Sequence, residues 1–116
     1  LIENNLDTVI DYLQLDIEPA ENTFNTLLLI PFEKYEFRII TFEHDYYLNH
    51  SVDYRRLSRK FLESLGYVRV VGNISPDKNS PFEDWWVNPN LVDPKILKTM
   101  TDLLDETKRA DQYMLL

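Results

Sequence analysis

The segment EFRIITFE, residues 36–43, constrains the fold more than any other part of the sequence. Its apolar side chains fall on both faces of an extended chain over the centre of the segment; they are Phe37, Ile39, Ile40 and Phe42. Strands that are apolar on both faces are typical of α/β sheets, in which helices cover both sides. The segment therefore predicts a central strand of such a sheet.

Three further segments are rich in the β-branched and aromatic residues that favour strands. They span residues 9–16, 67–74 and 83–88. Helical patterns lie between them. The first helix can start at Asn22 or Thr23 as N-cap and must end near Pro31, because proline disfavours helical backbone in the residue before it.

The second predicted helix lies within residues 51–66, and Gly66 is placed to end it in the left-handed conformation. Its apolar side chains recur at helical spacing; they are Tyr54, Leu57, Phe61, Leu62 and Leu65. The last helix starts with Asp93 as N-cap and Pro94 at its first position. Lys108 and Arg109 would lie near its carboxyl end, where positive charge is favourable.

This order of elements predicts the topology. Each strand–helix–strand unit implies parallel neighbouring strands. The link SPDKNSPF between the last two strands is too short for a crossover helix, so we expect those strands to pair antiparallel, at an edge of the sheet. We therefore predict a single α/β domain over residues 1–116, a Rossmann-like portion with parallel strands, an antiparallel C-terminal strand pair and a terminal helix.

Composition limits the classes of partner. The formal net charge of −8 argues against nucleic acid, and no apolar run approaches the length of a membrane helix. Cysteine is absent, so disulfides and thiolate metal sites are excluded, and a cytoplasmic location is compatible with this. The basic segment YRRLSRK, residues 54–60, predicts the solvated face of an amphipathic helix, with a phosphate site as the alternative.

Acidic residues follow the first two predicted strands. Asp16 and Glu18 follow the first, and Glu43, His44, Asp45 and Tyr46 follow the second. Because ligands bind beyond the carboxyl ends of parallel strands, these groups should share one rim of the sheet. Two carboxylates roughly 7 Å apart on a strand repel by about 2 kcal/mol at an effective dielectric constant of about 20. A covered site would therefore need a cation, a proton or a ligand that donates hydrogen bonds.

Several interpretations of this rim remain open. Oxygen ligands with one imidazole suit a divalent metal such as magnesium, manganese or zinc. One of the acids, or His44, could instead be a general base toward a hydroxyl. The structural alternatives are that Asp16 and Glu18 interact with the start of the next helix and that His44 bonds to a loop carbonyl. His50 is a weaker candidate of the same kind.

The adjacent residues Trp85 and Trp86 must point to opposite faces of their strand. One indole therefore belongs to the core, and the other covers a helix, an interface or a ligand. We expect packing at both positions.

Three segments together resemble a known family. They are IDYLQLDIEPAENTFNTLLLIPFEKYEFRIITFEHD (10–45), RRLSRKFLESLGYVRV (55–70) and PFEDWWVNPNLV (81–92). They look like the second half of an FkbM-type methyltransferase, which has a class I S-adenosylmethionine-dependent fold. That family typically has an Asp-x-Glu-Gly motif after one strand and an acidic group after the next.

The resemblance implies roles for the rim residues. Asp16 and Glu18 match the acidic pair after the fourth strand of the seven-stranded sheet, with Pro19 in place of the usual glycine. Glu43 and His44 match the end of the fifth strand. The resemblance implies that Asp16, Glu18 and His44 position or deprotonate the methyl acceptor, either directly or through a metal, and that Glu43, Asp45 and Tyr46 bind it.

The resemblance also implies what this chain lacks. The glycine-rich turn and the ribose-binding acid that hold S-adenosylmethionine in the family have no counterpart here, so no cofactor-binding residue is assigned. We expect a C-terminal, acceptor-side portion that acts on an oxygen of a small molecule or sugar and is inactive alone. It would need an N-terminal half, which the sequence does not show. The alternatives are a non-catalytic interaction module, which could form homo-oligomers, and a metal-dependent hydrolase that uses the acidic rim.

Overall fold

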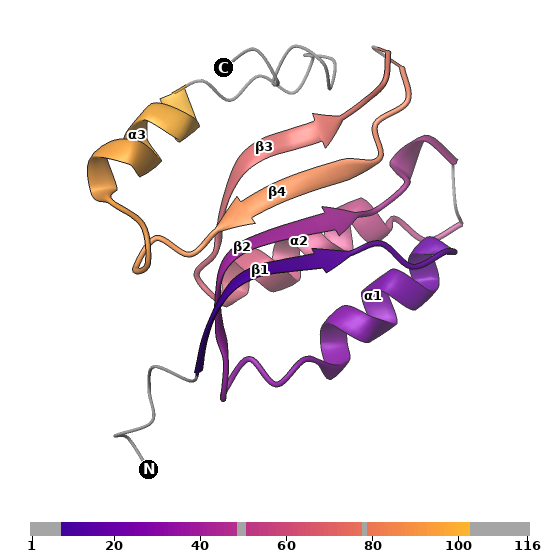
Figure 1. Ribbon diagram of the computed structural model, residues 1–116. Coiled ribbons are helices and arrows are strands. Elements are labelled where there is room, and N and C mark those ends of the chain that lie inside the picture. Colours follow the sequence, from indigo (N-terminus) through magenta and orange to yellow (C-terminus); the bar gives the residue numbers. More distant parts are fainter. Residues whose placement is uncertain (1–7, 49–50, 78, 103–116) are drawn as a thin grey trace.

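The computed structural model describes residues 8–48, 51–77 and 79–102, which form a four-stranded mixed sheet with three α-helices (Figure 1). The elements follow one another as β1 (Val9–Leu15), α1 (Ala20–Leu29), β2 (Glu36–Glu43), the short 3₁₀ helix η2 (Tyr46–Leu48), α2 (Tyr54–Ser64), β3 (Val68–Ile74), β4 (Glu83–Val87) and α3 (Pro94–Asp102). The predicted α/β class and the predicted order of elements are confirmed.

The strands lie in the order β1-β2-β4-β3. β1 and β2 are parallel neighbours, as predicted, and β3 and β4 pair antiparallel, also as predicted. The prediction for the second strand–helix–strand unit is wrong, because β4 lies between β2 and β3 and pairs antiparallel with both. The reversed strand is therefore inside the sheet, and β1 and β3 are the edges of the described sheet.

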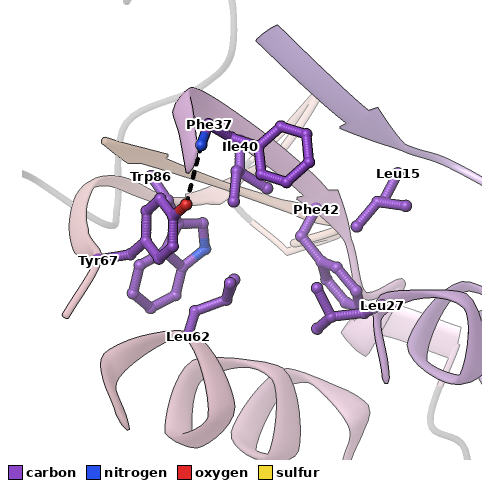
Figure 2. Close-up of a cluster of buried hydrophobic side chains, with 8 residues drawn as sticks. All are labelled: Leu15, Leu27, Phe37, Ile40, Phe42, Leu62, Tyr67 and Trp86. Atoms are coloured by element: carbon purple, nitrogen blue, oxygen red, sulfur yellow. Dashed lines mark hydrogen bonds between the residues drawn. The ribbon is translucent and has the colours of Figure 1, made fainter. Parts of the chain in front are cut away.

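Helices α1 and α2 cover one face of the sheet and close the larger hydrophobic core over it (Figure 1). Figure 2 shows Leu27 of α1 and Leu62 of α2 directed toward side chains of the strands. Trp86 is completely buried there, and the hydroxyl of Tyr67 accepts a hydrogen bond of 3.1 Å from the backbone N–H of Phe37 (Figure 2). This core fixes the positions of β1 and β2, whose carboxyl ends carry the acidic residues.

Helix α3 covers only part of the opposite face, over β3 and β4. Trp85, like Leu97 and Met100 of α3, packs against a smaller hydrophobic cluster on this face, while Trp86 belongs to the core on the other face. The prediction for the two indoles is confirmed. The prediction that β2 is covered on both faces is wrong at Ile39, which is 38% exposed because no described helix reaches that part of the sheet.

The helix ends follow local hydrogen bonding. Helix α1 begins at Ala20, after Pro19, so the predicted N-caps Asn22 and Thr23 are wrong. Thr23 is buried in the first turn instead, where its hydroxyl bonds to the backbone of Ile17. Two other predicted helix ends are confirmed: Gly66 follows α2 with a φ of +92°, and Asp93 Oδ1 accepts from the backbone N–H of Lys95 at 2.8 Å. The predicted role of Lys108 and Arg109 falls outside the described residues.

Candidate functional site

The carboxyl ends of β1 and β2 bring their acidic residues together. Leu15 of β1 is the register partner of Phe42 of β2, so Asp16 and Glu43 follow side by side. The Glu43 carboxyl group hydrogen-bonds to the side chains of Asp16 and Asp45. The predicted convergence of the two acidic ends on one rim is therefore confirmed for these three residues, which we call the acidic cluster.

The acidic cluster holds a proton. Burial of Glu43, its hydrogen bonds with Asp16 and Asp45 and the negative charges of both raise the pKa of Glu43 to about 9. At neutral pH Glu43 is therefore a neutral acid that donates a hydrogen bond to a neighbouring carboxylate. A shared proton relieves the repulsion between carboxylates placed so closely.

A further carboxyl group, Glu83, lies beside the cluster. Glu83 is the register partner of Glu43 across the β2–β4 pair, and burial, which exceeds the effect of its bond to Trp85, raises its pKa. Trp85 Nε1 donates to Glu83 Oε2 at 2.6 Å. The expectation that ligands bind beyond the carboxyl ends of parallel strands does not predict Glu83. Glu83 lies at the amino end of β4, which runs antiparallel to β2.

Glu18 does not join the acidic cluster. It is exposed in the turn between β1 and α1, where its carbonyl oxygen accepts from the Asn22 side chain at 3.4 Å. The chain leaves the strand at Asp16, so Asp16 and Glu18 do not share a strand face as the sequence suggests. The role of Glu18 in catalysis stays a prediction.

Two residues of the cluster line a pocket of about 410 Å³. Glu43 and Asp45 form one part of its wall. The other lining residues are Tyr47, Pro76, Ser80 and Phe82. Asp45 is held there with a φ of +48° and with its backbone N–H bonded to the Phe82 carbonyl oxygen at 3.1 Å. The pocket thus places acidic groups beside an aromatic ring and a phenol, a lining suited to a ligand with hydroxyl groups.

Tyr46, a predicted substrate-binding residue, is not among the residues that line this pocket. The guanidinium carbon of Arg55 lies 3.4 Å from the centre of its ring. Its binding role stays a prediction. The neighbouring Tyr47 lines the pocket instead.

His44 is completely buried and faces the interior. Its Nδ1 accepts from the backbone N–H of Tyr46 at 3.2 Å, which leaves Nε2 as the ring nitrogen that can donate. Nε2 lies 3.3 Å from Asp84 Oδ1, without the alignment of a hydrogen bond. His44 is therefore placed to support Asp84, and its predicted catalytic role stays a prediction. His50 lies outside the described residues.

Asp84 is the centre of a buried polar network that the sequence does not reveal. Arg59 donates to both of its carboxylate oxygens, at 2.8 and 2.9 Å, and the backbone N–H of Asn73 donates to Oδ1 at 2.9 Å. Burial raises the pKa of Asp84, but the hydrogen bonds and the charge of Arg59, with a smaller contribution from the nearby His44 Nε2, outweigh burial and hold the pKa well below its usual value. The network anchors α2 to β3 and β4 next to the acidic cluster.

The acidic cluster is not arranged as a metal site. Within residues 8–48, 51–77 and 79–102, no three His, Asp or Glu side chains are grouped so that they could hold a metal ion. The hydrogen bonds of Glu43 with Asp16 and Asp45 join these carboxyl groups to one another. The divalent metal stays a prediction without support from the donor geometry.

The residues present also do not fit a nucleotide-sized methyl donor. The sequence contains two glycines, of which Gly66 ends α2 and Gly72 lies within β3. Neither is in a turn that leads from a strand into a helix, where a glycine-rich loop would approach such a cofactor. The turn after β1 contains Pro19 instead.

Comparisons with protein-family models, with curated proteins and with solved structures gave no match. Of the helices in the described part of the chain, none has both the length and the apolar character needed to cross a membrane.

Proposed function

We propose that this chain is the acceptor-binding portion of a cytoplasmic, Rossmann-like S-adenosylmethionine-dependent methyltransferase that methylates an oxygen of a small molecule or sugar. The observation that carries the proposal is the acidic cluster at the joint rim of two parallel strands, beside a pocket lined by Glu43 and Asp45. The resemblance of residues 10–45 to FkbM-type sequences adds the reaction class.

The geometry suggests roles for two residues. When an acceptor binds, protonated Glu43 can turn its single O–H from the neighbouring carboxylate to an oxygen of the acceptor, while Asp45 can accept a hydrogen bond from the hydroxyl group of the acceptor. When the cluster loses its shared proton, it becomes a stronger base than an ordinary carboxylate, because its pKa is about 9. In this proposal Asp16 positions Glu43 and shares its proton, and His44 positions Asp84.

The methyl donor would be held by residues outside the described part of this chain. We expect calorimetry to show no binding of S-adenosylmethionine to the 116-residue chain and clear binding to the product of the whole reading frame. Micromolar binding by the 116-residue chain would contradict the division of roles, and binding by neither protein would contradict the methyltransferase proposal.

The roles of the acidic cluster need a separate test. Glu43→Gln and Asp45→Asn should each reduce methyl transfer by the whole protein to a panel of hydroxylated acceptors, by about 100-fold if the residue takes part in proton transfer. Glu36→Gln is the matched control, because Glu36 is exposed at the opposite end of the same strand. Equal activity of Glu43→Gln and Glu36→Gln would remove Glu43 from the mechanism.

A second candidate function, self-association as an interaction module, is favoured by one specific feature. Tyr12 and Ile39 are register partners on β1 and β2, and the Tyr12 hydroxyl bonds to Thr41, whose register partner Trp85 packs on the α3 side of the sheet. Tyr12 and Ile39 are 51% and 38% exposed. Tyr12 belongs to β1, which is an edge strand of the described sheet, so its backbone groups can pair with another strand. The third class, a metal-dependent hydrolase, gains no comparable support.

A further inference from the structure

A second pocket, of about 380 Å³, lies between α2 and β3 and is lined by charged side chains. Five of them are cations, namely Arg55, Arg56, Arg59, Lys60 and Arg69. The two others are the carboxylates Asp53 and Glu63. The lining therefore has a formal charge of +3 on a chain whose net charge is −8. We call this cavity the basic pocket.

Two of these arginines are held in place by the surrounding structure. Arg59 is fixed by its two bonds to Asp84 and by a bond of 3.0 Å from Nη2 to Asn73 Oδ1. Arg55 donates to the same Asn73 oxygen at 3.0 Å, and its guanidinium lies over the ring of Tyr46. Rigid guanidinium groups lose less conformational freedom when a ligand binds.

The charge of Arg55 is not neutralised by these contacts. The Asn73 amide oxygen and the Tyr46 ring are both neutral, and among the described residues no carboxylate forms an ion pair with Arg55. Arg55 is half-buried, so its charge is poorly hydrated as well. A group of this kind favours an anionic ligand, since a charge that leaves water is stabilised by an opposite charge.

The other cations add to the positive potential that Arg55 creates in the basic pocket. Arg56 and Lys60 are exposed residues four apart on α2, so they lie on the same side of the helix beside Arg59. Asp53 is the N-cap of α2, where its Oδ1 accepts the backbone N–H of Arg56 at 2.9 Å, and with Glu63 it offsets only two of the five positive charges of the lining. Guanidinium and ammonium groups converging on one cavity match the oxygens of a phosphate group.

We propose that the basic pocket binds a small phosphorylated molecule, whose phosphate group is held by Arg55, Arg56 and Lys60. The volume of about 380 Å³ is that of a small-molecule site. The overall charge of −8 opposes the approach of a long polyanion such as nucleic acid, whereas a single phosphate group meets mainly the local field. This site is separate from the acidic cluster and does not depend on the methyltransferase proposal.

The test is a titration of the 116-residue chain with inorganic phosphate and with pyrophosphate, followed by amide chemical shifts. We expect saturable shifts in α2 and β3 and tighter binding of pyrophosphate. The double variant Arg56→Gln/Lys60→Gln should weaken binding about tenfold or more. The control Lys34→Gln/Lys95→Gln removes the same charge from exposed positions outside the pocket and should bind as the wild type does.

One variant should act in the opposite direction. Glu63→Gln removes a carboxylate from the lining and should tighten phosphate binding by several-fold, a gain that misfolding cannot produce. Equal weakening by both double variants would show that only the net charge matters, and no effect of Glu63→Gln would show that the phosphate does not bind near the lining of the basic pocket; either result would overturn the proposal. Tighter binding of a single-stranded oligonucleotide through the same residues would overturn the assignment to a small ligand.

Discussion

The raised pKa of Glu43 makes the stability of the folded protein depend on pH. Its pKa is raised from 4.5 to about 9, so between these values the folded protein binds a proton that the unfolded chain does not. The contribution of Glu43 to stability is complete below 4.5 and is lost as the pH rises through about 9. We therefore expect the melting temperature to fall over this interval.

The variant Glu43→Gln tests this dependence, because glutamine keeps a hydrogen-bond donor for Asp16 and Asp45 at every pH. Thermal melts across the interval should show a smaller decrease with pH for Glu43→Gln than for the wild type. Glu36→Gln, at the exposed end of the same strand, should leave the decrease unchanged. A wild-type melting temperature that rises toward pH 9 would contradict the raised pKa.

Asp84 contributes a pH dependence of stability that is opposite in sign to that of Glu43. Its pKa is lowered in the folded state, so its stabilising effect is present above the ordinary value of 3.8 and disappears as the pH falls through the lower folded pKa. Asp84→Asn leaves the partly buried Arg59 without its counter-charge and should cost about 3 kcal/mol at neutral pH. Urea unfolding measures this loss. Asp102→Asn, which removes an exposed ion pair with Lys98, should cost well under 1 kcal/mol.

At the scale of elements, Gly66 is the residue on which the end of α2 depends. Its φ of +92° favours glycine, and no atom lies within 4 Å of the position that a Cβ would occupy. Gly66→Ala should therefore destabilise the fold by about 1–2 kcal/mol through backbone strain alone, and Gly66→Asn by less. Equal stability of the three proteins in urea would show that the strain argument fails here.

The elements themselves follow closely from the sequence. The predicted range 36–43 is the range of β2, since β-branched and aromatic residues fill it and turn residues flank it. The position of β4 could not be predicted in this way. The short link between β3 and β4 predicts that these two strands pair, but it does not predict on which side of β3 the strand β4 lies. In the structure β4 lies next to β2, which buries Trp86 in the core together with Leu62 of α2.

The residues of the site could likewise be predicted where they depend on β1 and β2, but not where they depend on the position of β4. Asp16, Glu43 and Asp45 could be found because they follow parallel strands. Glu83 could not, since its position depends on the direction of β4. The burial of His44 had a signal in the sequence: His44 is two residues after the core residue Phe42, so an extended chain directs both side chains to the same buried face.

At the scale of the whole molecule, the uneven covering of the sheet makes self-association the expected behaviour. Helices α1 and α2 cover one face, but the other is open over β1 and β2, where Tyr12 and Ile39 are exposed. Two copies of the edge strand β1 could pair antiparallel about a two-fold axis, which would extend the sheet and bring the two apolar patches next to each other.

We therefore expect light scattering to detect a dimer whose fraction increases with protein concentration. Tyr12→Lys should shift the protein to monomer, because a charge on an edge strand opposes pairing with another strand. Leu29→Lys is the matched control: Leu29 is 82% exposed on α1, away from the open face, and its replacement should leave the dimer intact. A monomeric wild type at all concentrations, or equal dissociation by both variants, would exclude β1 as the dimer interface and leave the open face of the sheet without a role in self-association.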